Sequence, residues 1–301
     1  CIRWMMDNYD AIAAKAPAEY LARLISVAGG SDPATFERVR AFLQSPGRRS
    51  EYGDVVIAKA ADRLAARGFD LLLVARDLER LESAATHLRT QHGIQVEVLK
   101  ADLTQKDDIL KLEQRLRTDS SITLLVNNAG VAADGLLANA DLDQLEKLIQ
   151  LNVTTVTRLA SAAAAGFTKA GRGTIINIAS VVALFPERFN ATYSASKAYV
   201  LSLSQSLGAE LEGTGVKVQA VLPGVTRTEI WERSGIDASQ IPADMVMDAG
   251  EMVDAALSGL DQGELVTIPS LPDANEWSAF VAARHVMAPN LSKSKAAARY
   301  K

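Results

Sequence analysis

Tyr193 and Lys197 are the pair of residues in this sequence best suited to proton transfer. The apolar residues around and after them recur with a helical period, and residues four apart lie on one face of a helix. A phenol ionises near pH ~10 in water and exchanges protons poorly at neutral pH. A neighbouring cation stabilises the phenolate, so we expect Lys197 to lower the pKa of Tyr193. The alternative, an exposed helical pair without function, stays open for so short a motif.

Ser180 lies thirteen residues before Tyr193 and directly follows the apolar run 174–179. Such a run is typical of a buried parallel strand, which places Ser180 at the carboxyl end of that strand. There its hydroxyl can hold a substrate oxygen. Of the six tyrosines, only Tyr193 has a lysine four residues later.

Further short segments accompany this group in a fixed order along the chain. They are Asn127-Asn128-Ala129-Gly130, Leu151-Asn152-Val153, and Pro223-Gly224 followed by Thr226 and Thr228. Together with Tyr193-Ser-Ala-Ser-Lys197 they resemble the short-chain dehydrogenase/reductase family, from about residue 61 to the end of the chain. The resemblance implies an α/β fold with a doubly wound parallel sheet and a reaction that interconverts a carbonyl and an alcohol.

The resemblance also implies a role for each catalytic residue. Tyr193 would donate or take the proton, and Lys197 would lower the pKa of that phenol and hold the nicotinamide ribose. Ser180 would steady the substrate oxygen, and Asn152 would position a water for proton supply. Asn152 falls inside a long predicted helix from Asp141 to about residue 167, so an ordinary position on a polar helix face is the alternative.

Two residues at strand ends resemble the family's contacts to the adenosine part of the cofactor. Arg76 follows the apolar run 70–75, where an arginine suits a 2′-phosphate, so the resemblance favours NADP over NAD. Asp102 follows the next strand and matches an acidic residue that contacts adenine. The alternatives are a solvated arginine and a helix N-cap for residues 104–117.

The remaining cofactor-binding residues implied by the resemblance are small or lie at a strand end. Asn128, Ala129 and Gly130 leave room for the adenosine part of a dinucleotide, unless they form a plain turn. Pro223 and Gly224 would border the nicotinamide, with Thr226 on its carboxamide.

The family's glycine-rich phosphate loop has no counterpart in this sequence. It is expected at residues 50–57, where Gly53 is the only glycine and residues 55–57 are β-branched. Such residues adopt positive φ angles only at a cost. Residues 45–49 lack a strand pattern, and a helix beginning near Asp54 is expected instead. We therefore predict a Rossmann-like sheet without its usual first strand and loop.

Residues 1–60 are predicted to be a helical extension, and residues 61–301 the nucleotide-binding domain. Trp4–Tyr9 and Arg40–Pro46 resemble the C-terminal helical tail of zinc aminopeptidases related to puromycin-sensitive aminopeptidase. The His-Glu-x-x-His helix of a peptidase is absent, so no peptidase activity is implied. The alternative is an unrelated helical extension. In either case the sequence resembles a junction between two genes.

Net charge and the content of cysteine and histidine limit the classes of binding partner and the cellular compartment to be expected. The 301 residues carry a net charge of −4 with a pI near 5.5, which gives no electrostatic reason to expect nucleic acid or an anionic membrane. One cysteine, no long apolar run and no leader favour a cytoplasmic protein. The three histidines have no metal-ligand spacing, so we expect no metal site. The resemblance implies a small or medium organic substrate and a homodimer or homotetramer.

Two functions of different kinds remain open at this point. One is an NADP(H)-dependent oxidoreductase whose substrate is selected by the irregular segment 228–248. The other is a non-catalytic remnant that keeps the fold only as a packing or oligomer scaffold, because the phosphate loop is missing. NADPH binding discriminates between them.

Overall fold

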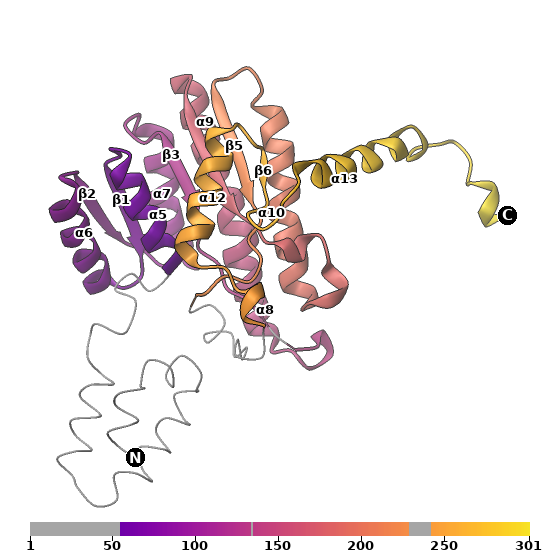
Figure 1. Cartoon of the computed structure of the whole chain (residues 1–301), viewed down its shortest axis with the longest axis horizontal. Coiled ribbons are helices and arrows are strands. Elements are labelled where there is room, and N and C mark those ends of the chain that lie inside the picture. The colour runs from indigo at the N-terminus through magenta and orange to yellow at the C-terminus, as the bar shows by residue number, and fades with distance from the viewer. Residues whose placement is uncertain (1–54, 134, 229–241) are drawn as a thin grey trace, which may run out of the picture.

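The computed structural model describes residues 55–133, 135–228 and 242–301. In these ranges parallel strands alternate with helices that cover both faces of the sheet (Figure 1). The predicted doubly wound α/β fold is therefore confirmed. The aminopeptidase-like tail, the expected phosphate loop up to residue 54 and most of the proposed substrate segment lie outside the described residues.

The strands are β1 (Leu71–Ala75), β2 (Val96–Lys100), β3 (Leu124–Asn127), β4 (Gly173–Ile178), β5 (Val216–Val221) and β6 (Val266–Thr267). The helices are α5 (Val55–Ala66), α6 (Leu78–His92), α7 (Lys106–Thr118), α8 (Leu142–Ile149), α9 (Val156–Ala170), α10 (Ala191–Glu210), α12 (Ala249–Asp261) and α13 (Ala274–Met287). A π-helical turn, Gln150–Thr155, joins α8 to α9. Short 3-10 helices span Leu137–Asn139, Val181–Ala183, Pro186–Arg188, Ala243–Met245, Ala288–Asn290 and Ala298–Tyr300.

The sheet consists of two separate parallel ladders. One has the order β3-β4-β5-β6, and the other pairs β1 with β2. Among the described residues no strand lies between β1 and β3, the position at which the sequence predicted a missing strand. Residues 55–57, the last of the expected phosphate loop, are instead the first turn of α5.

Apolar side chains on each face of the sheet form the core. On one face α7 and α9 pack over the strands around Phe167 and Ile175. On the other face α5 and α12 pack around Leu64 and Met252. A Cβ at Gly166 would lie 2.2 Å from the Leu116 carbonyl oxygen, so only glycine allows α9 to approach α7 this closely.

The last helix contacts the core mainly through Trp277, which packs against the apolar cluster around Val200 and Leu222. Helix α13 extends away from the sheet (Figure 1), and none of its residues is buried. No helix in the described ranges is both long enough and apolar enough to span a membrane.

Candidate active site

Asn190 fixes the start of α10, the helix that carries Tyr193 and Lys197. Its Oδ1 accepts a hydrogen bond from the backbone N–H of Tyr193 at 3.0 Å, as an N-cap residue does. Its Nδ2 donates to the carbonyl oxygen of Gly135 at 2.9 Å. One side chain thus joins the loop after β3 to the first turn of α10. The sequence analysis did not single out Asn190, although an asparagine before a helical run is an N-cap signal.

Tyr193 and Lys197 lie on one face of α10, as their spacing predicted. The Lys197 Nζ is 5.9 Å from the centroid of the Tyr193 ring. It donates a hydrogen bond to the carbonyl oxygen of Ile178 at 2.9 Å, at the end of β4. Lys197 is buried, at 7% exposure, so its position is fixed by this contact with the strand end.

The expected lowering of the Tyr193 pKa is not what the structure shows. Burial raises the pKa of Tyr193 to about 12, and only a hydrogen bond with Ser180 acts in the opposite direction. The physical reason is that a half-buried phenolate is poorly solvated, while Lys197 is directed to Ile178. The phenol therefore keeps its proton at neutral pH.

Ser180 lies at the carboxyl end of β4, where the sequence placed it. Its Oγ accepts from the N–H of Val182 and donates to the carbonyl oxygen of Pro223, both at 3.3 Å. With its hydrogen bond to Tyr193, Ser180 connects the ends of β4 and β5 to the phenol. This hydroxyl and the phenol can act on one oxygen atom.

Asn152 lies in the π-helical turn and is 1% exposed. Its Oδ1 accepts from the N–H of Val131 at 2.9 Å, and its Nδ2 donates to the Val131 carbonyl at 2.8 Å and to the Ser196 hydroxyl at 3.2 Å. The predicted continuous helix from Asp141 is therefore wrong at this point. The π turn, a feature often found at functional sites, brings the amide against the loop after β3.

Gly130, in the loop after β3, lies close to the side chains of Asn152 and Lys197. A Cβ built there would lie 3.2 Å from the Asn152 Oδ1 and 3.6 Å from the Lys197 Nζ. The first distance is tighter than an ordinary contact. A glycine at this position thus lets the loop, the π turn and α10 converge.

Three buried polar side chains next to the site are bonded in series, and the sequence analysis did not predict this chain of hydrogen bonds. The Nδ2 of Asn127 donates to the Oδ1 of Asn177 at 2.9 Å, and the Nδ2 of Asn177 donates to the Ser204 hydroxyl at 3.0 Å. The signal was present, because Asn177 interrupts an apolar strand and a buried amide needs partners. This chain of hydrogen bonds ties β3 to β4 and β4 to α10.

Pro223, Gly224 and Thr226 follow β5 at the same edge of the sheet. Pro223 is buried, and its carbonyl accepts from the N–H of Val181 at 3.0 Å. Thr226 is 5% exposed and donates to the Gly224 carbonyl at 3.3 Å. Asn128 and Ala129 lie beyond the end of β3 at that edge, Asn128 half-buried and Ala129 exposed.

Arg76 and Asp102 belong to the other ladder. Arg76 is exposed directly after β1. Asp102, after β2, accepts from the backbone N–H of Thr104 at 2.9 Å and from its hydroxyl at 2.8 Å. The N-cap of α7 is Gln105, so the alternative that Asp102 caps this helix is wrong.

The described residues fit one half of a nicotinamide dinucleotide. The buried ammonium of Lys197 and the small residues after β5 would hold the nicotinamide and its ribose at the carboxyl ends of the strands. For the pyrophosphate, the described part of the chain offers only the first turn of α5, with Val55 and Val56 in place of glycines. Among the described residues no group of three or more His, Cys, Asp or Glu is placed to hold a metal ion.

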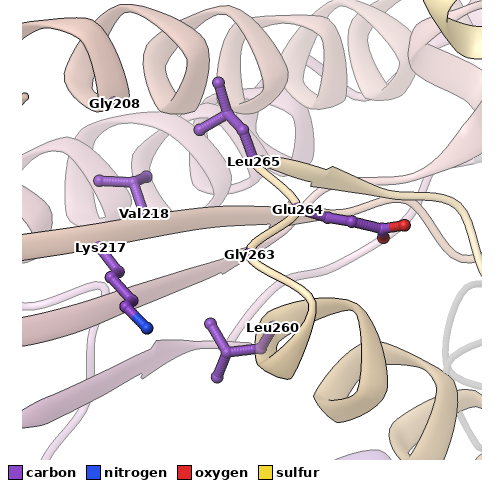
Figure 2. A pocket seen from close by; sticks show the side chains of 7 residues that line it. All are labelled: Gly208, Lys217, Val218, Leu260, Gly263, Glu264 and Leu265. Atoms are coloured by element: carbon purple, nitrogen blue, oxygen red, sulfur yellow. The ribbon is translucent and has the colours of Figure 1, made fainter.

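A cavity of about 260 Å³ lies near the amino ends of the strands, opposite to the end that carries Tyr193 and Ser180 (Figure 2). It is lined near the amino ends of β5 and β6 by Lys217, Val218 and Leu265, with Leu260 and Glu264 from the end of α12 and the loop after it. None of the residues that converge around Tyr193 lines it. It is therefore separate from the candidate active site.

The parallel sheet with helices on both faces has the Rossmann-type architecture. The model of the short chain dehydrogenase family matches residues 57–238. The chain belongs to this family, so the predicted family is confirmed.

Solved structures of similar proteins agree with this assignment. A short-chain dehydrogenase from Sphingobium yanoikuyae, solved in complex with NADPH, is 48% identical, with a TM-score of 0.78 over 81% of this chain and 95% of that chain. A bulky-bulky ketone specific alcohol dehydrogenase from Comamonas testosteroni is 42% identical, with a TM-score of 0.74 over 81% of this chain and 94% of that chain.

Among curated proteins, the human 17-beta-hydroxysteroid dehydrogenase type 3 is 33% identical over 63% of this chain and 62% of its own length. An NADPH-dependent 1-acyldihydroxyacetone phosphate reductase from Schizosaccharomyces pombe is 35% identical over 54% of this chain and 53% of its own length. The chain thus spans somewhat more than half of these relatives.

Proposed function

We propose that this chain is an NADP(H)-dependent reductase that converts a ketone or aldehyde of small or medium size into an alcohol. The observation that carries the proposal is the convergence of Tyr193, Ser180 and Lys197 at the carboxyl ends of β4 and β5. The bound cofactor supplies the hydride.

Tyr193 acts as the proton donor to the substrate oxygen. Because burial holds the pKa of Tyr193 at about 12, the phenol is protonated at neutral pH, which suits reduction better than oxidation. Ser180 holds the same oxygen through its hydroxyl. Lys197 places a positive charge near the phenol and holds the nicotinamide ribose, and Asn152 keeps the loop after β3 in place and positions the water that returns a proton.

Arg76 provides the preference for NADP over NAD. It is exposed directly after β1, where a guanidinium meets a 2′-phosphate, and an arginine forms paired hydrogen bonds with phosphate oxygens. Asp102 borders the adenine on the neighbouring strand, Asn128, Ala129 and Gly130 border the adenosine, and Pro223, Gly224 and Thr226 border the nicotinamide. The Sphingobium dehydrogenase, 48% identical to this chain, is described as a complex with NADPH, which supports this preference.

One similar protein suggests a first substrate to test at the upper end of this size range. The Comamonas relative is described as specific for bulky-bulky ketones, so a ketone with two large substituents is the first substrate to test. We further propose that the protein is cytoplasmic and forms a homodimer or homotetramer, and that residues 1–60 and 61–301 are separate domains.

A second function, the non-catalytic remnant, is favoured by one observation. Val55, Val56 and Ile57, at the end of the expected phosphate loop, form the first turn of α5 with β-branched side chains where glycines would allow the backbone to approach a pyrophosphate closely.

Titration of the full chain with NADPH, followed by cofactor fluorescence, tests the two functions against each other. The reductase predicts saturable binding in the micromolar range, corresponding to about −8 kcal/mol or better. NADH should bind more weakly. No signal at ~1 mM NADPH, which corresponds to about −4 kcal/mol, would favour the remnant.

A further inference from the structure

The break in the sheet is bounded on one side by the free edge of β1. In a parallel ladder both backbone groups of one residue point to one neighbouring strand, and those of the next residue point to the other side. The Leu71 N–H donates to the Gln95 carbonyl, and the Ala75 carbonyl accepts from the Ala101 N–H, so residues 71, 73 and 75 are directed to β2. Leu72 and Val74 are therefore directed into the break.

The free edge of β3 bounds the other side. The Thr174 N–H donates to the Thr123 carbonyl, and Leu124 is in register with Thr174, so residues 123, 125 and 127 are directed to β4. Leu124 and Val126 are then directed into the break. Within the described ranges, no residue hydrogen-bonds to the backbone groups of Leu72, Val74, Leu124 or Val126.

Both faces of the break are walled by apolar side chains. Val74 and Leu125 pack against the cluster under α7 and α9. Leu71 and Val126 pack against the cluster under α5 and α12. A strand in the break would turn its side chains alternately to these two clusters, so all of its residues would need to be apolar.

The strands beside the break are also incompletely covered. All five residues of β1 and the first three of β3 are half-buried, whereas the central residues of β4 and of β5 are buried. Strands of a parallel sheet are normally buried on both faces. Helix α5 contributes to the apolar clusters on both sides of the break, because Leu64 belongs to the cluster that includes Leu124, and Ala65 to the cluster that includes Leu73.

We propose that this break is a docking site for a parallel strand of about five apolar residues supplied by another polypeptide, a form of β-strand addition. The neighbouring part of the same chain is chemically unsuited to it. Residues 45–54, which lead directly into α5, contain Pro46, Arg48, Arg49, Glu51 and Asp54, and a central strand excludes proline and buried charge. This inference rests on the sheet and is independent of the proposed reductase activity.

The test uses the full chain and a labelled synthetic peptide of five alternating valines and isoleucines followed by a soluble Gly-Ser-Lys tail. Fluorescence anisotropy should show saturable binding. Hydrogen exchange should be fast at the amides of Leu72, Val74, Leu124 and Val126 in the free chain and slow with peptide. The amides of residues 73 and 125, which already pair with β2 and β4, are the internal control and should stay protected throughout.

Two N-methylated peptides complete the test, one methylated at its even positions and one at its odd positions. A strand between β1 and β3 uses both sets of amides, so each peptide should bind about tenfold or more weakly. A loss with only one of them would show docking on a single edge and would overturn the proposal. No binding at ~1 mM peptide, a limit of about −4 kcal/mol, or unchanged exchange would overturn it too.

Discussion

The two ladders of the sheet differ in how their strand ends are held. At the end of β3-β4-β5-β6, amides and hydroxyls bond directly from one element to the next, as in the contacts of Asn152 with Val131 and of Ser180 with Pro223. At the end of β1-β2, Arg76 is exposed, the Asp102 carboxylate bonds to Thr104 within its own turn, and the Asp102 N–H donates to the Asp108 carboxylate of α7. The residues around Tyr193 are therefore joined by direct bonds at the carboxyl ends of the four-stranded ladder, and Thr155 of the π turn also donates to the Leu103 carbonyl after β2. Arg76 and Asp102, two of the residues proposed to hold the adenosine, lie on the two-stranded ladder.

The largest effect should come from the residues around Tyr193 at the carboxyl ends of β4 and β5. Lys197→Met removes the ammonium beside Tyr193 and its hydrogen bond to Ile178, and turnover should fall by about 10²-fold or more. Lys217→Met is the matched control, because Lys217 lines the cavity near the amino ends of the strands. NADPH oxidation measures both variants. Equal losses in the two variants would contradict the placement of the chemistry.

A stability measurement tests how tightly the loop after β3 packs against Asn152. Gly130→Ala places a Cβ against the Asn152 Oδ1 and should weaken the bonds to Val131, at a cost of about 1–3 kcal/mol in the free energy of unfolding. Gly224→Ala is the control, since its Cβ meets only the Ser270 hydroxyl at an ordinary 3.8 Å. Urea unfolding of both variants gives the difference. An unchanged midpoint for Gly130→Ala would mean that the convergence is loose.

The two-stranded ladder should affect cofactor choice rather than chemistry. Arg76→Ser should reduce the preference for NADP over NAD by about tenfold, which corresponds to about 1.4 kcal/mol, with little change in kcat. Arg80→Ser is the control, because Arg80 pairs with Asp77. Dissociation constants for both cofactors measure the ratio. If kcat fell as much as the preference for NADP over NAD, Arg76 would act in the chemical step and not only in cofactor choice.

The pH dependence tests whether burial dominates over the neighbouring ammonium. With the pKa of Tyr193 at about 12, the tyrosinate absorbance that distinguishes wild type from Tyr193→Phe should be absent at pH 10 and rise towards pH 12. Since this pKa lies above that of an unfolded tyrosine, near ~10, the contribution of the protonated phenol to stability is complete below pH 10 and is lost as the pH rises to 12. A difference signal already at pH 8 would show that Lys197 controls the phenol.

The smallest effect concerns the link between the ladders. Arg67, after α5, pairs with Asp261 of α12 through contacts of 3.0 and 2.9 Å, both near the surface. Arg67→Ala should cost no more than about 1 kcal/mol in unfolding free energy. Arg117→Ala, exposed on α7, is the control. A much larger loss would mean that ion pairs, rather than apolar packing, hold α5 in place.

Local patterns in the sequence were sufficient to predict the strands and the face of α10. Runs such as residues 174–179 are apolar throughout, and the spacing of Tyr193 and Lys197 follows from the helix alone. The gap between β1 and β3 in the described part of the sheet agrees with the composition of residues 45–49, which lacks a strand pattern.

Tertiary contacts account for what the sequence did not reveal. Nothing in the period of residues 141–167 distinguishes one π turn from a continuous helix. Asn127 and Asn177 are fifty residues apart, so their pairing depends on strand register. The pKa of Tyr193 depends on a contact between Lys197 and Ile178 that helical spacing does not contain.

The most direct test of the proposed chemistry is transfer of deuterium from nicotinamide-deuterated NADPH to a bulky ketone, followed by mass spectrometry of the alcohol, in the full chain and in Tyr193→Phe. The proposed mechanism predicts deuterium on the carbinol carbon with the wild type and a loss of at least about 10²-fold in rate with Tyr193→Phe. Transfer at equal rates in the two proteins, or no transfer by a wild type that binds NADPH, would contradict it.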